Sequence, residues 1–349
     1  MAQSTPIGVA LIGGGIWARE EHAPAVEAAK DTLTLKAVYS RSAASAKSLA
    51  ESVSYPVDLY SEDGDKSLDE LLQRPDIGAV IIALSIESQP RFIKAALLAG
   101  KHVLSEKPVA ENIQDAEDLI KWYRADIKGP TWAVAENFRY LNCYNYAAEQ
   151  IKGMGKITNF QGRQQSCIPI DMKFNLTPWR QVPTHQGGYL LDGGVHNMAG
   201  LRLLLGAQPG NEIATLSAFT NQLQPYLPPV DTADMILRTR SGVTGAFQVS
   251  RGTTLRGDEL TVACEDGWVK IENEKVTISR DGKEQTTTVA NERTGVPPEI
   301  RAWGASLVAG KVVPEQEPEA ALADLELIEL MLNSGAQDGK PLVCKHQVV

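Results

Sequence analysis

The sequence contains few of the patterns that indicate a membrane, metal-binding or disulfide-rich protein. No apolar run approaches the roughly 18 residues needed to span a bilayer, and the first residues lack the basic flank and cleavage site of a signal peptide. The four cysteines are widely spaced without a Cys-x-x-Cys pair, and the five histidines show no metal-binding spacing. These absences predict a cytoplasmic protein with reduced cysteines, no membrane contact and no metal.

A basic excess is also missing. The chain has 34 Lys and Arg against 43 Asp and Glu, a formal net charge of -9. Broad nucleic-acid binding needs a clustered basic face that neutralises phosphates, so a small-molecule partner is the better prediction. The 349 residues, 43% of them hydrophobic, exceed the length at which one core usually stops growing. We therefore expect two domains.

Apolar strands alternate with helices in the first part of the chain. We expect strands at 7–12, 33–40, 77–84, 101–106 and 131–137, and helices at 17–30, 45–53, 90–100 and 116–126. This order predicts a parallel, doubly wound sheet that binds its ligand at the carboxyl ends of the strands. We assign residues 1–128 to this dinucleotide-binding domain of Rossmann type.

The pattern changes in the remaining part, 129–349. After a helix at 144–153, strands follow at 156–168, 214–223, 231–240, 243–252, 258–266, 268–273, 275–281 and 284–290. They predict an α+β domain with one large, mainly antiparallel open sheet, which helices near 188–205, 297–309 and 318–333 cover on one face. The open face predicts a homodimer, and we assign substrate binding and dimerisation to this domain.

A glycine-rich turn directly follows the first strand. Residues 13–18 read Gly-Gly-Gly-Ile-Trp-Ala and fit G-x-G-x-x-A, in which missing side chains let backbone N–H groups approach a pyrophosphate at a helix N-terminus. Such turns also serve tight packing, so the pattern alone leaves both interpretations open. We expect these residues to bind the cofactor: Gly13, Gly15, Ile16 and Trp17.

The end of the second strand discriminates between NAD(H) and NADP(H). A carboxylate there binds the ribose 2′-hydroxyl, whereas an Arg accommodates a 2′-phosphate. The sequence has Ser40, Arg41 and Ser42 at this point, with Lys47 about one helical turn further on, and no acid. Two hydroxyl groups and two cations suit a phosphate, so we predict NADP(H). The alternative is that Arg41 merely points into solvent.

At 99–119, AGKHVLSEKPVAENIQDAEDL, the sequence resembles the Gfo/Idh/MocA family of nicotinamide-dependent oxidoreductases, whose signature is Glu106-Lys107-Pro108 here. The resemblance continues through TWAVAENFRY at 131–140 and GGYLLDGGVHNMAG at 187–200 to the C-terminal helix. It implies a Rossmann domain followed by an open-sheet domain, often paired sheet to sheet in a dimer. It also implies redox chemistry on sugars, inositols and related cyclic compounds.

Lys107 directly follows a strand at the edge where a doubly wound sheet binds its ligand. An ammonium group there stabilises negative charge that develops on a substrate oxygen. The alternative is a lysine that extends from a strand end into solvent. Glu106 is expected to orient Lys107 or its loop and, like Lys107, to contact the cofactor, and similar proteins suggest a cis bond before Pro108.

Asp192 and His196 are four residues apart in an apolar stretch and would share one face of a helix. Histidine suits the transfer of a hydroxyl proton near neutral pH, and the carboxylate would position the imidazole. By similarity to the family, this pair and Lys107 are the catalytic residues and converge beside the nicotinamide. The alternative is an Asp that caps the helix and a His that is bonded in the core.

Further candidates follow from position. Trp179 and Arg180 lie on a Pro-flanked stretch and suit a sugar ring or the cofactor, although packing or a dimer contact explains the Trp equally well. Leu84 and Ser85 begin the stretch where many family members have T-P-N-x-x-H, and Asn137 follows the last strand of the first domain. We expect these three to lie along the cofactor as well. Arg139 and Tyr140 should face the same crevice as Asn137, with Tyr140 as the weakest candidate of the three.

One departure from the family concerns the substrate. Three residues after the helix histidine the family often has Asp, whereas this chain has Ala199, which makes a less polar substrate more credible. The sequence predicts an NADP(H)-dependent dehydrogenase or reductase of a carbonyl or secondary alcohol in a sugar, polyol or related cyclic molecule. Two alternatives stay open: a lyase or hydrolase that retains its cofactor, and a regulatory protein that senses NADP(H) without turnover.

Overall fold

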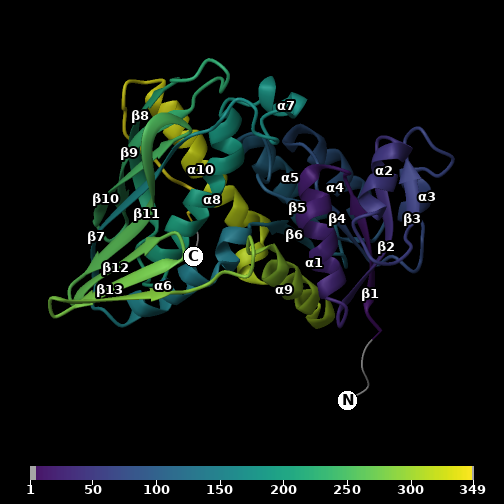
Figure 1. The fold of residues 1–349 in the computed structure, drawn as a ribbon, viewed down its shortest axis with the longest axis horizontal. Helices are drawn as coiled ribbons and strands as arrows, with labels where there is room; N and C mark the ends of the chain where they lie inside the picture. Colours follow the sequence, from purple (N-terminus) through teal and green to yellow (C-terminus); the bar gives the residue numbers. More distant parts are fainter. Residues whose placement is uncertain (1–4, 348–349) are drawn as a thin grey trace. The chain divides into compact units, whose positions relative to one another are not determined.

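The computed structural model describes residues 5–347, which form two compact units (Figure 1). The first unit contains the described residues up to Ala110, Gln114–Asn137 and Glu292–Pro318. The second contains Glu111–Ile113, Phe138–Asn291 and the described residues from Glu319 onward. The sequence suggested a division near residue 128. The two units differ from it mainly because segment 292–318 belongs to the first unit.

A parallel six-stranded sheet forms the centre of the first unit. Its order is β3-β2-β1-β4-β5-β6. The strands are β1 Ile7–Ile12, β2 Leu33–Ser40, β3 Asp58–Ser61, β4 Ala79–Ile82, β5 His102–Glu106 and β6 Trp132–Ala135. The order reverses between β1 and β4, and such a switch point at the carboxyl ends of the strands is where doubly wound sheets bind ligands. The predicted Rossmann-type sheet is confirmed.

Helices connect these strands in the order that the sequence predicts. The connections are η1 Ala18–His22, α1 Ala23–Ala28, α2 Ala43–Ala50, α3 Leu68–Leu72, η2 Ile86–Ser88, α4 Gln89–Leu98 and α5 Ile113–Asp126. Two further elements of this unit, α9 Val296–Ala309 and η4 Pro314–Gln316, come much later in the chain, after β14. The first connection departs from a regular α-helix, because η1 is a π-helical turn closed by a bond from the Ala23 N–H to the Ala18 carbonyl. Such turns are frequent at functional sites.

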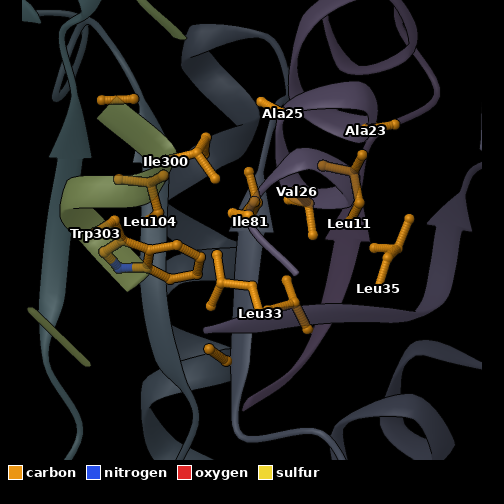
Figure 2. Close-up of a cluster of buried hydrophobic side chains, with 14 of the residues drawn as sticks. Leu11, Ala23, Ala25, Val26, Leu33, Leu35, Ile81, Leu104, Ile300 and Trp303 are labelled. Carbon is orange, nitrogen blue, oxygen red and sulfur yellow. The ribbon is translucent and has the colours of Figure 1, made fainter. Parts of the chain in front are cut away.

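The expected placement of 297–309 over the antiparallel sheet is wrong, because α9 packs in the first unit. Ile300 and Trp303 of α9 are fully buried and join the hydrophobic cluster that Val26 of α1 and Leu33 of β2 also form (Figure 2). Gly304 allows this approach, since a Cβ there would overlap Thr32 and Leu33. Periodicity revealed this helix, but it did not reveal which sheet the helix covers.

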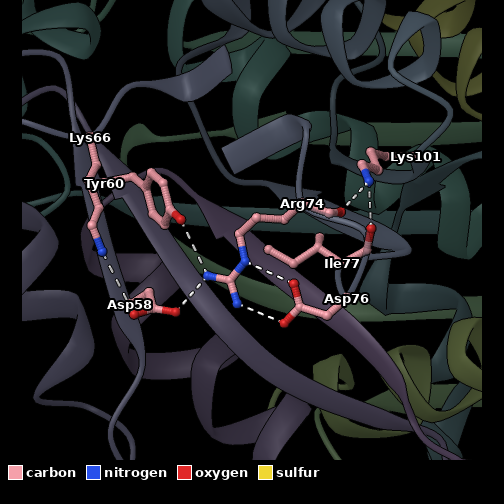
Figure 3. Close-up of polar contacts among 7 residues, drawn as sticks. All are labelled: Asp58, Tyr60, Lys66, Arg74, Asp76, Ile77 and Lys101. Carbon is pink, nitrogen blue, oxygen red and sulfur yellow. Dashed lines mark hydrogen bonds and ion pairs between the residues drawn. The ribbon is translucent and has the colours of Figure 1, made fainter. Parts of the chain in front are cut away.

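The amino ends of the parallel strands are held by a polar network around Arg74 (Figure 3). Its guanidinium donates to both carboxylate oxygens of Asp76, at 3.0 and 2.7 Å, and to Asp58 at 2.6 Å. The Lys101 ammonium donates to the Arg74 and Ile77 carbonyls, both at 2.7 Å. This end of the sheet lies opposite the carboxyl edge, so the network serves the fold.

A nine-stranded sheet forms the centre of the second unit, in the order β14-β13-β12-β11-β7-β10-β9-β8-β15. Its strands are β7 Ile157–Cys167, β8 Ile213–Asn221, β9 Thr232–Thr239, β10 Thr244–Ser250, β11 Gly252–Cys264, β12 Gly267–Glu272, β13 Lys275–Arg280, β14 Lys283–Thr288 and β15 Leu342–Val343. Only β7 and β10 pair in parallel; the other neighbours are antiparallel. The predicted large, mainly antiparallel sheet is confirmed.

The helices of the second unit include α6 Asn142–Lys152, α7 Pro178–Gln181, α8 Gly188–Leu205 and α10 Pro318–Gly335, and η3 Asn137–Tyr140 precedes them at the unit boundary. Helix α6 packs on β12 and β13, and α8 packs on α6, β7 and β11. Two glycines of α8 bring helices together: a Cβ at Gly200 would overlap Tyr144 of α6, and one at Gly194 would press on Ile328 of α10. The expected covering of one face by α8 agrees with these contacts.

Candidate active site

The glycine-rich turn has the geometry of a phosphate cradle. Gly13, at the carboxyl end of β1, has φ +116°, and a Cβ there would overlap the Ala83 carbonyl. A Cβ at Gly14 would overlap the hydroxyl group of Ser45, whereas the space beside Gly15 is open. Since the chain comes closest to its neighbours at the first two glycines and leaves room at the third, the turn fits a dinucleotide pyrophosphate.

The end of β2 has both cations and carboxylates around it. Arg41 and Lys47 are exposed, and neither forms an ion pair with any residue between 5 and 347. Ser42 caps α2 by accepting the Ser45 N–H at 3.2 Å. Asp63, which was not predicted, accepts the Ala43 N–H at 2.7 Å. The acid comes from the end of β3, so strand-end inspection of β2 alone missed it.

Tyr39, the residue before Ser40, is tied to a second carboxylate. Its hydroxyl group donates to Glu62 at 3.1 Å, and burial together with that carboxylate raises the pKa of Tyr39 to about 12. Both acids beside β2 thus already accept a hydrogen bond from the chain. Arg41 and Lys47 are the groups there that carry no such partner in the described chain.

The residues after β4 border the same cradle. The Leu84 side chain lies against Gly13, and the Ser85 hydroxyl group donates to Glu87 at 2.7 Å. Gln89 is 1% exposed, and its amide has no hydrogen-bond partner within residues 5–347. It stands where many family members have the histidine of T-P-N-x-x-H.

The Glu-Lys-Pro segment begins at the end of β5. Glu106 is the last residue of that strand, and one of its carboxylate oxygens accepts the Lys107 backbone N–H at 3.2 Å. The bond between Lys107 and Pro108 is cis, which confirms the expectation. Because all strands of this sheet are parallel, Lys107 emerges at the same edge as the glycine turn.

Asp192 and His196 share the first half of α8 in the second unit. Asp192 is 7% exposed and accepts a hydrogen bond from the Arg180 guanidinium, whose Nε lies 2.7 Å from Oδ2. The helix begins at Gly188, so Asp192 is past its first turn, and no side chain caps the helix. The capping interpretation is therefore wrong, and His196 is only half-buried, unlike a core histidine.

The imidazole of His196 stacks on the Phe138 ring, with ring centroids 4.8 Å apart and planes at 15°. Phe138 lies between two predicted site residues, Asn137 and Arg139, but was not itself predicted. Aromatic residues in an extended-to-helical stretch are usually core, so no sequence signal separates this ring from others. The stack fixes the plane of the imidazole, and the His196 side chain is half-buried.

Arg180 contributes to the environment of Asp192 together with its neighbour. Its guanidinium lies over the Trp179 ring, 3.9 Å from the centroid, and donates to the Thr177 hydroxyl group at 3.2 Å. The structure therefore brings Trp179, Arg180 and Asp192 together. The packing interpretation of Trp179 and a ligand role both agree with this stack.

Two of the candidates beyond β6 have structural partners. The Asn137 amide donates to the Thr294 carbonyl at 2.5 Å in the first unit. Arg139 is buried and pairs with Asp324, which Arg202 also binds at 2.6 Å. The expectation that Arg139 faces the crevice is not met, because a buried guanidinium needs a carboxylate partner and Asp324 provides it.

Two residues that the sequence did not single out lie beside α8. A Cβ at Gly193 would lie 3.8 Å from the Tyr189 ring and 4.0 Å from the Arg251 guanidinium. Arg251 donates to the Gln164 side chain at 3.1 Å and forms no ion pair within the described residues. Burial lowers the pKa of Arg251 and raises that of Tyr189.

Arg251 lines a polar hollow of about 450 Å³ in the second unit. Gln164 bonds to two charged residues that line this hollow. Its side-chain oxygen accepts from the Arg251 guanidinium, and its amide nitrogen donates to the Asp258 carboxylate. Burial raises the pKa of Asp258. A neighbouring hollow shares Gln164 and Asp258 and reaches Phe138, on which His196 stacks. Amide, carboxylate and guanidinium groups of this kind bind hydroxyl groups.

Other kinds of site find no support in residues 5–347. None of their helices combines the length and apolar character needed to cross a bilayer. No three of their His, Cys, Asp or Glu side chains gather closely enough to hold a metal ion. All four cysteines are unpaired, and burial raises the pKa of Cys264 to about 11.

Comparisons with known proteins agree with this geometry. Residues 7–127 match the model of an oxidoreductase family with an NAD-binding Rossmann fold, and residues 150–270 match the GFO/IDH/MocA C-terminal domain. The dehydrogenase FPY6 of Fusarium mangiferae is 38% identical, covering 98% of this chain and 100% of its own. The myo-inositol 2-dehydrogenase of Thermotoga maritima is 25% identical over 67% of this chain and 65% of its own. A crystal structure of a Thermotoga maritima oxidoreductase has a TM-score of 0.85 at 28% identity, covering 97% of this chain and 98% of that one.

Proposed function

The chain belongs to the Gfo/Idh/MocA family of NAD(P)-binding oxidoreductases, and on that premise we propose that it is an NADP(H)-dependent dehydrogenase or reductase. Its substrate is a carbonyl or secondary alcohol of a sugar, polyol or related cyclic molecule. The observation that carries the proposal is the buried Asp192, held by Arg180 one helical turn before a half-buried His196.

The glycine turn and the end of β2 support the choice of cofactor. Gly13, Gly15 and the helix start after them would hold the pyrophosphate, and Ile16 and Trp17 form that helix start. Arg41 and Lys47 would bind the 2′-phosphate, because neither is neutralised by a carboxylate in the described chain. Bound NADP(H) would supply or accept the hydride.

His196 moves the proton in this proposal. When an alcohol is oxidised, its ring nitrogen accepts the hydroxyl proton; in the reverse direction it donates a proton to the oxygen. The Phe138 stack holds the ring plane, so little reorientation is needed before transfer. Asp192, held by Arg180, binds a neighbouring hydroxyl group of the substrate.

Lys107 stabilises the oxygen on which negative charge develops, and we propose that it acts on the same substrate as Asp192 and His196. It lies at the ligand-binding edge of the parallel sheet, directly after Glu106. An ammonium group in a partly desolvated site lowers the energy of a developing alkoxide. Loss of one such donor typically raises the activation barrier by about 3 kcal/mol. Trp179 and Arg180 complete the substrate or nicotinamide contacts.

The class of substrate is supported from two sides. One relative is named a myo-inositol 2-dehydrogenase, and the hollow around Arg251, Gln164 and Asp258 offers donors and acceptors for hydroxyl groups. Ala199 is buried and apolar where the family often has Asp. A substrate with fewer hydroxyl groups at that side than an inositol therefore fits this chain.

The test is transfer of deuterium from NADPH labelled at nicotinamide C4 into products formed from a panel of cyclic ketones, aldoses and their polyols. Mass spectrometry then identifies the product, and absorbance follows the cofactor. Deuterated product with stoichiometric NADPH oxidation supports the proposal. Product without net oxidation indicates a cofactor-retaining lyase or hydrolase, and tight NADPH binding with no product indicates a sensor; either result refutes it.

A further inference from the structure

His22 lies at the end of the π-helical turn that follows the glycine cradle. It is fully buried, and its Nε2 is 2.6 Å from Oε1 of Glu106. Its other ring nitrogen, Nδ1, has no hydrogen-bond partner in the described chain. Because a carboxylate only accepts hydrogen bonds, the tautomer with hydrogen on Nε2 fits this contact. In that tautomer His22 donates to the Glu106 carboxylate.

The Glu106 carboxylate has a second bond that reaches the Lys107 backbone. Its Oε2 accepts the Lys107 N–H at 3.2 Å while Oε1 accepts from His22. The side chain of Glu106 is 12% exposed. A carboxylate bound at both oxygens has little freedom, so the start of the turn that carries Lys107 is held from the side of His22.

The π-helical turn connects this contact to the cradle. The Arg19 N–H donates to the Gly15 carbonyl, so the helix starts at the last glycine of the cradle. His22 lies three residues after Arg19 in the same turn. Glu21, the residue before His22, is also buried and accepts the Thr294 hydroxyl group at 2.7 Å. Two consecutive buried polar side chains thus fasten this turn to two other segments of the first unit.

From this geometry we propose that His22 is a positioning residue, which sets the place of Lys107 relative to the glycine cradle through Glu106. An apolar side chain would fill the same volume without the cost of burying an imidazole and a carboxylate. A hydrogen-bonded pair instead defines one geometry. The part of the inference that concerns catalysis rests on the proposed function, whereas the part that concerns Lys107 does not.

The experiment compares His22→Leu, which removes the donor, with His22→Gln, which restores one. His102→Leu is the matched control: His102 is a histidine at the other end of β5, where its Nδ1 accepts the Thr131 N–H at 3.0 Å. The first readout is the rate at which reductive methylation labels Lys107, measured by peptide mass spectrometry at equal folded fraction. This readout needs no turnover.

We expect His22→Leu to change the labelling rate of Lys107 by about threefold or more, and His22→Gln and His102→Leu to leave it within about twofold. With an active substrate, His22→Leu should lower kcat about 10- to 100-fold, since a misplacement of about 1 Å costs about that much, with NADPH affinity within about twofold. His22→Gln should recover most of this kcat. If His22→Leu does not fold, His22→Asn replaces it, because the shorter amide cannot reach Glu106.

The inference is overturned if Lys107 in His22→Leu is labelled at the wild-type rate. It is also overturned if His102→Leu changes the labelling rate and kcat as much as His22→Leu does. A changed labelling rate without any redox activity supports the positioning role of His22 and refutes the proposed function. Unchanged labelling with full activity does the reverse. The two proposals therefore fail in different measurements.

Discussion

At the scale of single residues, the choice of cofactor depends on Arg41. We predict that Arg41→Asp raises the KM for NADPH at least tenfold while changing the KM for NADH much less. A hydrogen bond to a charged group is worth about 1.5–3 kcal/mol, and the introduced carboxylate also repels the 2′-phosphate. Steady-state kinetics with both cofactors measure the two values. Lys30→Asp, on an exposed turn of the same unit, is the control, and equal effects on both cofactors would remove the assignment to NADP(H).

Asp76 allows a prediction of pH dependence. Its hydrogen bonds from Arg74 hold its pKa below the ordinary carboxyl range, so the pair stabilises the fold above the unfolded pKa near 3.9 and loses this effect as the pH falls. Asp76→Asn should therefore lower the free energy of unfolding at pH 7 by about 0.2–1 kcal/mol, the range of exposed pairs. The difference from wild type should be smaller at pH 2.5 than at pH 7.

Urea titrations at the two pH values measure this difference. Asp65→Asn is the control, because Asp65 is exposed and forms no hydrogen bond or ion pair within the described residues. A deficit of the Asp76 variant that persists unchanged at pH 2.5 would show that the carboxylate charge is not the cause.

At the scale of helices and strands, sequence patterns predicted most elements and missed particular associations. The strand at 33–40 and the helix at 188–205 have the predicted bounds, because periodicity is a local property of the chain. The placement of α9 failed, since an apolar helix face does not specify which sheet it covers. Within the candidate site, spacing in the sequence was enough to propose Gly13 and Asp192. The contacts of Phe138 and His22 join segments that are distant in the chain, and no local pattern encodes them.

The packing of α9 yields a prediction at this scale. Trp303 is fully buried in the core of the first unit, and Trp303→Ala should lower the free energy of unfolding by about 3–5 kcal/mol, as large-to-small core changes do. Val308→Ala, on the exposed side of the same helix, should cost less than about 0.5 kcal/mol. Denaturant titration of both variants measures the contrast. Equal small effects would show that α9 is not part of this core.

At the scale of the whole molecule, the open sheet face predicts a homodimer. Phe219 on β8 and Ile236 on β9 are exposed large side chains. Phe219 is directly opposite Asp234, and Ile236 lies two residues after Asp234, so Phe219 and Ile236 share one face of the sheet. Light scattering at micromolar concentration should give a dimer. Ile236→Arg should weaken it by about 2–5 kcal/mol, since a buried charge without a partner is costly.

The control is Leu98→Arg, at another exposed apolar position, on α4 of the other unit, which should leave the dimer intact. A monomer for the wild-type protein would contradict the prediction, as would equal dissociation by both variants.

The central claim is that Lys107, Asp192 and His196 transfer a proton and stabilise an oxygen while hydride is exchanged. Single-turnover absorbance of NADPH, with the substrate that deuterium transfer identifies, tests it most directly. We predict that His196→Asn binds NADPH with wild-type affinity, that Lys107→Met still binds it, and that each variant slows its oxidation by about 10²- to 10⁴-fold. Oxidation by either variant at the wild-type rate would contradict the account.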